Sequence, residues 1–148
     1  MTAEESPGTG RVVVGVDGSP SSLDALSWAS SQAHLTGRTL EIVMTWEWPS
    51  SYGWAAPIPD DYDPEEELRR TLEAVVASAR ATYPDLSIDP RLVSGHPAPI
   101  LVEASKGADL LVVGSRGHGE FVGMLLGSVS EHCAMNAHCP VLVHRTTM

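Results

Sequence analysis

A glycine-rich segment near the C-terminal end of the chain has the residue types that phosphate binding requires. It contains Gly114, Gly117 and Gly127, and a helical pattern starts at Ser128. Glycine lets the backbone approach a phosphate closely, and the first amides of a helix have no partner within the helix and point at such an anion. The segment therefore predicts a phosphate site, with the hydroxyl groups of Ser128 and Ser130 beside the amides.

The same segment also has a purely structural interpretation. Glycines that follow a strand form turns, and Ser128 is a residue type that caps helices. The segment is not a P-loop, because the chain contains no Gly-Lys-Ser/Thr triplet. It is not a dinucleotide fingerprint either, because its glycines follow the fourth expected strand and not the first. From these residues alone, phosphate binding and a simple turn both stay open.

The elements that position this segment are expected to alternate between strands and helices. Apolar runs typical of parallel strands occupy residues 11–16, 39–46, 86–93, 109–113 and 140–145. Helical patterns start at Pro20 and Pro64, and two shorter ones cover about 97–105 and 128–137. The alternation predicts an α/β fold, an open doubly wound five-stranded parallel sheet with helices on both faces. Such sheets bind ligands beyond the carboxyl ends of their strands, where the glycine segment begins.

Side-chain spacing predicts which helix faces are buried. The first helix ends at Gly37, and its buried face is expected to contain Leu23, Leu26, Ala29 and Ala33. The second helix has an apolar face of Leu68, Leu72, Val75, Val76 and Ala79. Pro90 in the third strand lacks an amide donor, so this strand is expected at a sheet edge.

Composition and charge limit the classes of partner. The 148 residues fit one domain at 11–148, after a disordered arm at 1–10, and they carry a net charge of −10 with Lys106 as the sole lysine. A chain this acidic is not expected to bind nucleic acid, because that function needs a basic surface. Since the chain has few cationic side chains, an anionic ligand is expected to be held mainly by backbone amides and a metal ion. No apolar stretch approaches the roughly 20 residues of a membrane span. The first ten residues lack a basic signal region, and there are two cysteines, so a cytoplasmic location is expected.

Two other features of the sequence invite functional interpretations. His132, Cys133, His138 and Cys139 are possible zinc ligands, but their spacing matches no compact zinc pattern, so no metal site is predicted and Cys133 is expected to be a small buried apolar residue. The irregular segment 46–63 contains five aromatic residues and is interpreted either as a surface flap or as a cover for a ligand or partner. Its role stays open.

The spacing Gly114-x2-Gly117-x9-Gly127-Ser128 resembles the nucleotide-binding signature of the universal stress protein family. The segments Val12 to Ser19, Gly95-His96-Pro97 and Cys139 to Val143 are similar to other parts of the family in the expected order. The chain is therefore identified as a member, and its complete glycine signature indicates the ATP-binding branch. The resemblance implies the adenine nucleotide alpha hydrolase-like fold with strand order 3-2-1-4-5.

The resemblance also implies an ATP ligand, with Mg²⁺, across the first and fourth strands. The residues that match the family's contacts are Gly15, Val16, Asp17, Thr45, Gly114, Gly117, Gly127, Ser128, Val129 and Ser130. Asp17 is a candidate partner of the sugar or of a metal, and its alternative role is an Asx turn with Ser19. Thr45 is polar where the family places a small apolar residue against adenine, and Met44 replaces the family's usual histidine.

The function that the resemblance implies is a cytoplasmic regulatory protein that holds ATP in the stress response. It also implies a homodimer that pairs through the C-terminal strand, 141–145. A slow ATPase or a self-phosphorylating enzyme that uses Ser128 or Ser130 is an alternative. The groups nearest to these serines in the sequence that could assist phosphoryl transfer are Arg116 and His118, which are few for a fast reaction. A scaffold that binds AMP or cyclic AMP is another.

Overall fold

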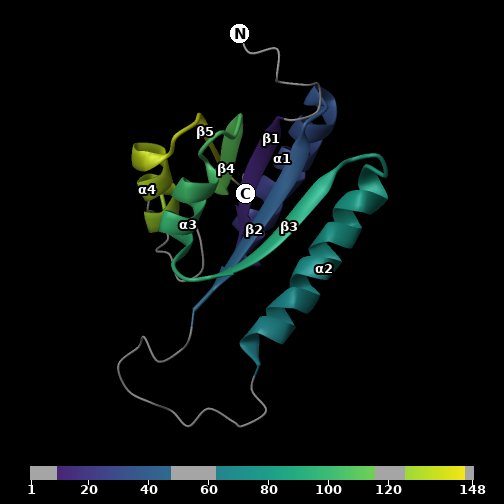
Figure 1. The fold of residues 1–148 in the computed structure, drawn as a ribbon, viewed down its shortest axis with the longest axis horizontal. Coiled ribbons are helices and arrows are strands. Elements are labelled where there is room, and N and C mark those ends of the chain that lie inside the picture. Colours follow the sequence, from purple (N-terminus) through teal and green to yellow (C-terminus); the bar gives the residue numbers. More distant parts are fainter. Residues whose placement is uncertain (1–9, 48–62, 116–125, 146–148) are drawn as a thin grey trace.

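The computed structural model describes residues 10–47, 63–115 and 126–145 (Figure 1). Strands and helices alternate along these residues, as the sequence predicts. In chain order they are β1 (Arg11–Val16), α1 (Pro20–Thr36), β2 (Thr39–Trp46), α2 (Pro64–Thr82), β3 (Ile88–Ser94), α3 (Pro97–Ala104), β4 (Leu110–Gly114), α4 (Ser128–Asn136) and β5 (Val141–His144).

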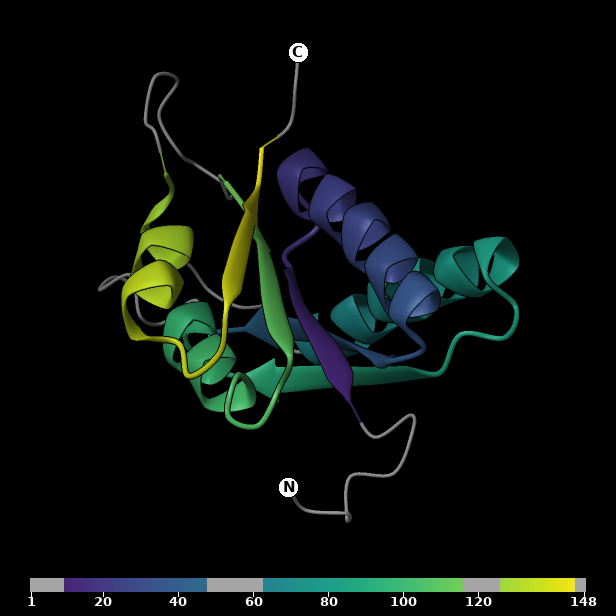
Figure 2. The same ribbon diagram turned by 90° about the horizontal axis from the view of Figure 1, so that it is seen from above.

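The strands form one parallel sheet in the order β3-β2-β1-β4-β5, which confirms the predicted fold and strand order. Helices α1 and α2 cover one face of the sheet, and α3 and α4 cover the other (Figure 2). Successive residues of a strand point to opposite faces, so each face has its own core. Val12, Val14 and Ile42 belong to the α1/α2 side, whereas Val13 and Val43 belong to the α3/α4 side.

The boundary of β3 differs from the prediction by two residues at its start. The Leu86 amide donates to the Tyr83 carbonyl at 3.0 Å and closes a turn, so the strand begins at Ile88 instead of residue 86. Leu86 is nevertheless buried, because the turn folds its side chain into the α1/α2 core. The apolar side chain of Leu86 thus caused the predicted strand to start too early, although the Leu86 backbone belongs to the turn.

The predicted buried face of α1 is wrong at Leu23, which is 41% exposed. Its place in the core is taken by Ser22, while Ala25 and Leu26 complete the first buried turns. A buried serine is acceptable here because the Ser22 hydroxyl donates to the Ser19 carbonyl at 3.0 Å. The arc of buried residues is therefore rotated away from Leu23. The remaining predicted residues of this face, and the apolar face of α2, pack as expected.

The two edges of the sheet differ in their outward hydrogen-bonding groups. In a parallel strand the amide and the carbonyl of one residue point toward the same neighbouring strand, and those of the next residue point to the opposite side. The Ser87 carbonyl and the Gly95 amide both bond to the β2 side, so the groups of Ile88, Pro90 and Leu92 point outward from β3. Pro90 has no amide and interrupts this outer edge, which confirms the predicted edge position of its strand.

The edge formed by β5 contains no proline between residues 141 and 144. The carbonyls of Pro140 and His144 accept from the Leu111 and Ser115 amides of the β4 side. The amides and carbonyls of Val141 and Val143 therefore point outward from the sheet. Within the described residues, the order of the sheet leaves this edge without a neighbouring strand.

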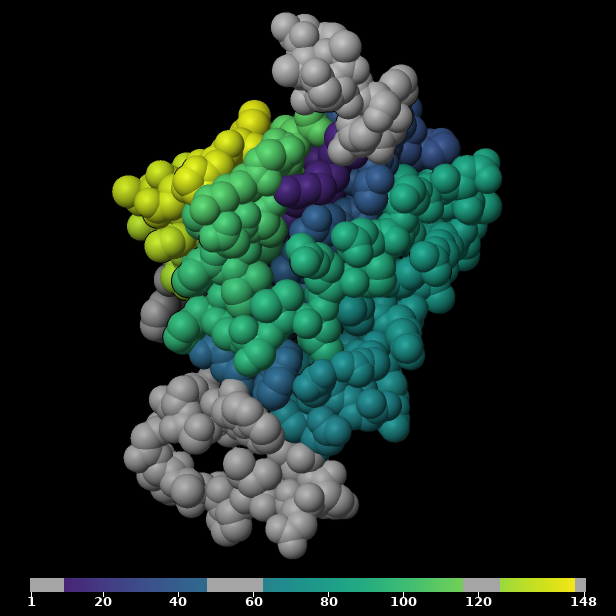
Figure 3. Space-filling model, viewed as in Figure 1, coloured from purple at the N-terminus to yellow at the C-terminus, as the bar shows by residue number. Residues whose placement is uncertain are grey.

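A charged side chain is buried on the α3/α4 side of the sheet near the start of the strands. The Glu41 side chain is 5% exposed, and its two carboxylate oxygens lie 3.6 Å from Arg11 Nη1 and 3.5 Å from Arg91 Nη1. The Arg11 guanidinium also donates to the carbonyls of Ala104 and Lys106 at the C-terminal end of α3, at 2.9 and 2.6 Å. In Figure 3, the purple atoms of β1 and the blue atoms of β2 reach the surface next to the green region that contains α3. Arg11 thus joins the starts of two strands to the end of a helix.

Of the helices in the described ranges, none combines the length and apolar character that crossing a lipid bilayer requires.

Candidate functional site

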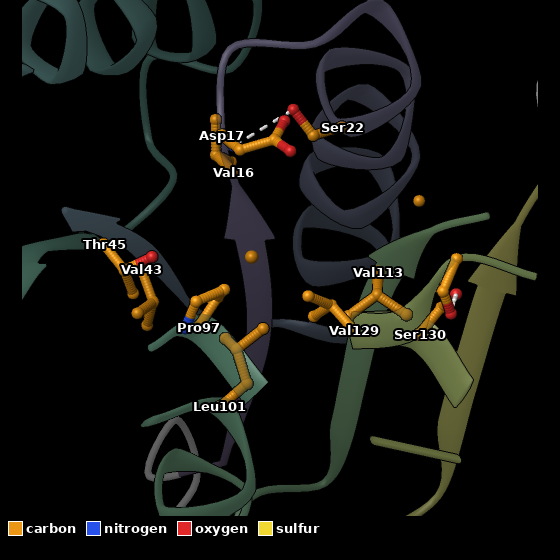
Figure 4. A pocket seen from close by; sticks show the side chains of 13 residues that line it. Val16, Asp17, Ser22, Val43, Thr45, Pro97, Leu101, Val113, Val129 and Ser130 are labelled. Carbon is orange, nitrogen blue, oxygen red and sulfur yellow. Dashed lines mark hydrogen bonds between the residues drawn. The ribbon is translucent and has the colours of Figure 1, made fainter. Parts of the chain in front are cut away.

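A cleft opens at the carboxyl ends of β1 and β4, where the chain leaves the sheet in opposite directions (Figure 4). The described residues that line it are Gly15, Val16, Asp17, Ser22, Val43, Thr45, Pro97, Leu101, Val113, Gly114, Gly127, Val129 and Ser130. None of these side chains is cationic, so among the described residues the groups that can bind an anion in the cleft are backbone amides and hydroxyls.

The first turn of α4 supplies such amides at one side of the cleft. Gly127 is the N-cap residue of this helix and has no side chain to satisfy them. The first amide that bonds within the helix is that of Glu131, which donates to the Gly127 carbonyl at 2.9 Å. The amides of Val129 and Ser130 precede it and have no acceptor within the helix, and both residues line the cleft. The interpretation of Ser128 as the cap is wrong, because Ser128 is the first helical residue.

A second helix that borders the cleft, α3, is built differently. Its N-cap residue His96 makes no side-chain capping bond, but the first and third helical residues are Pro97 and Pro99. Proline has no amide hydrogen, so only Ala98 offers an uncommitted donor in this turn. Side chains cap the remaining helices, since Ser19 accepts from Ser22 and Asp63 accepts from Glu66. The start of α4 is therefore the candidate anion-binding end of the cleft.

Gly114 ends β4 beside α1 and is required by close packing. A Cβ atom there would lie 2.6 Å from Ser21 Oγ and 2.9 Å from the carbonyl carbon and oxygen of Ser21. Gly15 also lines the cleft, but a Cβ there would meet the flexible end of Leu101, with Leu101 Cδ1 at 2.7 Å. Both glycines thus let neighbouring elements close around the cleft.

Asp17 follows β1 and is the only carboxylate among the described residues that line the cleft. Its Oδ1 accepts from the Ser19 amide at 2.9 Å, which is the Asx turn expected as its structural role. Its own amide donates to Ser22 Oγ at 3.2 Å (Figure 4). The turn fixes the position of Asp17 at the rim of the cleft and holds one of its carboxylate oxygens against the Ser19 amide.

The side of the cleft opposite α4 is mainly apolar. Val43 and Thr45 come from β2, and Pro97 and Leu101 come from α3, and they lie across the end of β1 from Val129 and Ser130 (Figure 4). A flat apolar ring fits such a wall, whereas a phosphate fits the amides of α4. We name these two sides the ring side and the anion side, after the ligand groups that their chemistry suits.

The two serines considered as phosphate acceptors have different environments. Ser130 is 2% exposed, and its hydroxyl donates to the Gly127 carbonyl at 3.0 Å and lies 3.4 Å from the Ser115 carbonyl. Ser128 is exposed. Gly117, with Arg116 and His118, lies outside the described residues, as do residues 48–62 of the aromatic segment.

Sequence reasoning missed five residues of the lining, Ser22, Val43, Pro97, Leu101 and Val113. Strand alternation identifies Val43 once Thr45 is placed, because residues two apart share a face. Helical spacing similarly links Leu101 to Pro97. Their meeting with β1 depends on long-range packing, for which a single sequence has no comparable signal.

The candidate zinc ligands show no convergent arrangement in the part of the chain that is described, where no three histidine, cysteine or acidic side chains are placed so that they could hold a metal ion. Cys133 is fully buried, as expected for a small apolar residue, and this burial raises the pKa of its thiol to about 11. Because the thiolate is the form that binds metal, a raised pKa disfavours Cys133 as a ligand.

Comparison with known proteins gives matches over nearly the whole chain. The model of the universal stress protein family matches residues 8–145. A universal stress protein of Mycolicibacterium smegmatis is 41% identical over 135 residues, which are 90% of this chain and 45% of that protein. One of Mycobacterium tuberculosis is 33% identical over 151 residues, which cover 99% of this chain and 52% of that protein. The chain thus spans about half the length of these curated relatives.

Solved structures show the same fold. The crystal structure of a universal stress protein in complex with cAMP is 32% identical with a TM-score of 0.69, over 93% of this chain and 98% of that chain. A family protein from Burkholderia pseudomallei is 28% identical with a TM-score of 0.65, over 94% of this chain and 98% of that chain. The sheet order, the cleft at its switch point and these matches agree, and the chain belongs to the universal stress protein family.

Proposed function

We propose that this chain binds an adenine nucleotide in the cleft and acts as a regulatory protein of the stress response that holds ATP. The observation that carries the proposal is the start of α4, where amides without a helical acceptor line a cleft that has no cationic side chain among its described residues. The opposite wall of Val43, Thr45, Pro97 and Leu101 suits the base. The structure in complex with cAMP, at 32% identity, supports an adenine ligand.

The proposed contacts divide the cleft among the parts of the ligand. The amides of Val129 and Ser130, with the exposed Ser128, would hold phosphate groups. Gly127, whose amide donates to the Ser115 carbonyl at 2.6 Å, would fix the start of the helix beside them, and Gly114 and Gly117 belong to the same segment. Gly15, Val16 and Asp17 would meet the sugar, and Thr45 the base. A Mg²⁺ ion bound with ATP supplies positive charge that neutralises the phosphates. Asp17 is the carboxylate placed to assist it.

Removing one amide from the first turn of α4 tests the anion side of the cleft. We expect Val129→Pro to weaken ATP binding by about tenfold or more relative to Val129→Ala, because a hydrogen bond to a charged group is worth about 1.5–3 kcal/mol. Proline is tolerated in a first turn, as α3 shows with Pro97 and Pro99. Val129→Ala is the matched control, since it loses the same packing and keeps the amide. The measurement is titration calorimetry with Mg-ATP on protein stripped of nucleotide.

Two results would overturn the assignment of this site. Equal affinities of Val129→Pro and Val129→Ala would place the phosphates elsewhere. No thermal stabilisation of the stripped wild-type protein by ATP, AMP or cyclic AMP would reject nucleotide binding altogether, because a ligand at 100 times its Kd stabilises by about 2.7 kcal/mol. Phosphate release above a protein-free control would favour the slow ATPase, and binding of AMP or cyclic AMP without ATP would favour the alternative scaffold.

We further propose that the protein is a cytoplasmic homodimer that pairs through β5. The outward groups of Val141 and Val143 offer a ladder to a second strand. Val143→Pro is expected to give a folded monomer, because the lost amide points away from β4. Leu142→Pro removes an amide that points toward β4 and is expected to lower the melting temperature instead. Sedimentation velocity and thermal melting distinguish the two, and a Val143→Pro protein that remains dimeric would exclude this interface.

A further inference from the structure

Glu47 extends the row of β2 side chains that forms the ring side of the cleft. Val43 and Thr45 line the cleft, and Glu47 is the next residue with the same alternation, one position beyond the end of the strand. It lies two residues beyond Thr45, outside the residues that line the cleft, and its contact with His96 brings it next to Pro97 of the lining.

A side-chain contact joins Glu47 to the start of α3. His96 Nδ1 lies 3.0 Å from Glu47 Oε1, and His96 directly precedes Pro97 of the lining. The Gly95 amide donates to the Trp46 carbonyl at 2.8 Å, which ties the same two segments through the backbone. His96 thus holds the Glu47 carboxylate by one oxygen and leaves Oε2 with no hydrogen bond or ion pair to any described residue.

The chemistry of the pair selects the kind of group that binds there. An ionised carboxylate accepts hydrogen bonds and donates none, so its ligand must bring a donor. A phosphate brings negative charge and is repelled, which favours the orientation with phosphates at α4. The part of a nucleotide farthest from its phosphates is the base, and the donor carried at the edge of an adenine base is its exocyclic amino group.

We propose that Glu47 is a specificity-determining residue that accepts a hydrogen bond from the amino group of the bound base, and that His96 positions its carboxylate. The inference rests on the proposed nucleotide site and adds the residues that recognise the amino group of the base. Thr45 and Pro97 bring the base to the mouth of the cleft, and the backbone bond between Gly95 and Trp46 fixes the spacing of the two residues that form the side-chain contact.

The probe is the triphosphate of purine riboside, which differs from ATP in having a hydrogen in place of the amino group. We expect the wild-type protein to bind ATP about tenfold more tightly than this analogue, and Glu47→Ala to bind both equally. His96→Ala keeps the Glu47 carboxylate but removes the side chain that fixes its position. The preference for ATP over the analogue is therefore expected to fall from about tenfold to a few-fold. Glu103→Ala is the matched control, since it removes a glutamate from an exposed pair with Lys106 at the far end of α3. It should retain the full preference.

A purely structural role of the side-chain contact would weaken both ligands together and leave their ratio unchanged. A Glu47→Ala protein that melts like the wild type and keeps the tenfold ratio would overturn the role of Glu47. A His96→Ala protein with the full ratio would overturn the positioning role of His96. If wild-type protein binds neither triphosphate, AMP nor cyclic AMP, the proposed function itself fails, a result separate from an unchanged ratio.

Discussion

Replacing Arg11 with methionine is expected to lower the free energy of unfolding by about 3 kcal/mol, because removing one partner of a buried ion pair leaves the other charge uncompensated. The Glu41 carboxylate would keep only Arg91, whose side chain is 55% exposed. The carbonyls of Ala104 and Lys106 would also lose the guanidinium that caps the end of α3. The loss is measured by urea denaturation, with an unchanged slope as the sign of an intact two-state transition.

Arg91→Met is the matched control for Arg11→Met. It removes the same charge from the same carboxylate but from a position open to water, so the expected loss is below about 1 kcal/mol. The double variant Arg11→Met, Glu41→Leu should recover part of the loss, because no buried charge remains. Equal losses for Arg11→Met and Arg91→Met, or no recovery in the double variant, would show that Glu41 does not depend on Arg11.

Gly114→Ala is expected to cost about 2–3 kcal/mol of stability, within the range of overpacked sites. The added methyl group would meet the carbonyl carbon and oxygen of Ser21, so the first turn of α1 has to shift. Gly15→Ala is the comparison, with an expected loss of about 1 kcal/mol, because the end of the Leu101 side chain can rotate away. Thermal and urea unfolding of both variants measure the difference.

The shift of α1 in Gly114→Ala should also reach the cleft, since the turn from Asp17 to Ser22 leads into that helix. Weaker ATP binding is therefore expected at temperatures where the variant is still folded. A variant as stable as Gly15→Ala would mean that β4 and α1 separate more easily than their contact indicates.

The fold was predictable because local signals agreed with the long-range arrangement. The strands are marked by β-branched apolar runs such as residues 11–16, and α1 ends at Gly37 in a left-handed conformation, φ 69°, as its sequence indicates. Local signals failed where a buried polar side chain forms a hydrogen bond to a nearby backbone carbonyl. Ser22 and Ser30 are buried because their hydroxyls bond to helix carbonyls, and apolarity alone therefore misplaced Leu23.

The candidate site was predictable in part. The glycine segment indicated the anion side, but the choice between capping and phosphate binding at Ser128 required knowing which residue begins α4. The ring side depends on Leu101 packing against Gly15, residues far apart in the sequence that the sheet brings together. Neither Leu101 nor Gly15 has a sequence pattern that identifies the other residue as its contact.

The unequal edges of the sheet limit how many copies can join. Pro90 interrupts the outer rim of β3, while the rim of β5 keeps its full set of donors and acceptors. Within the described residues, β5 is therefore the one edge with an unbroken row of outward donors and acceptors. If two copies pair through β5 as proposed, each copy uses its only unbroken described edge, and the edge that Pro90 interrupts is a poor template for adding a third copy.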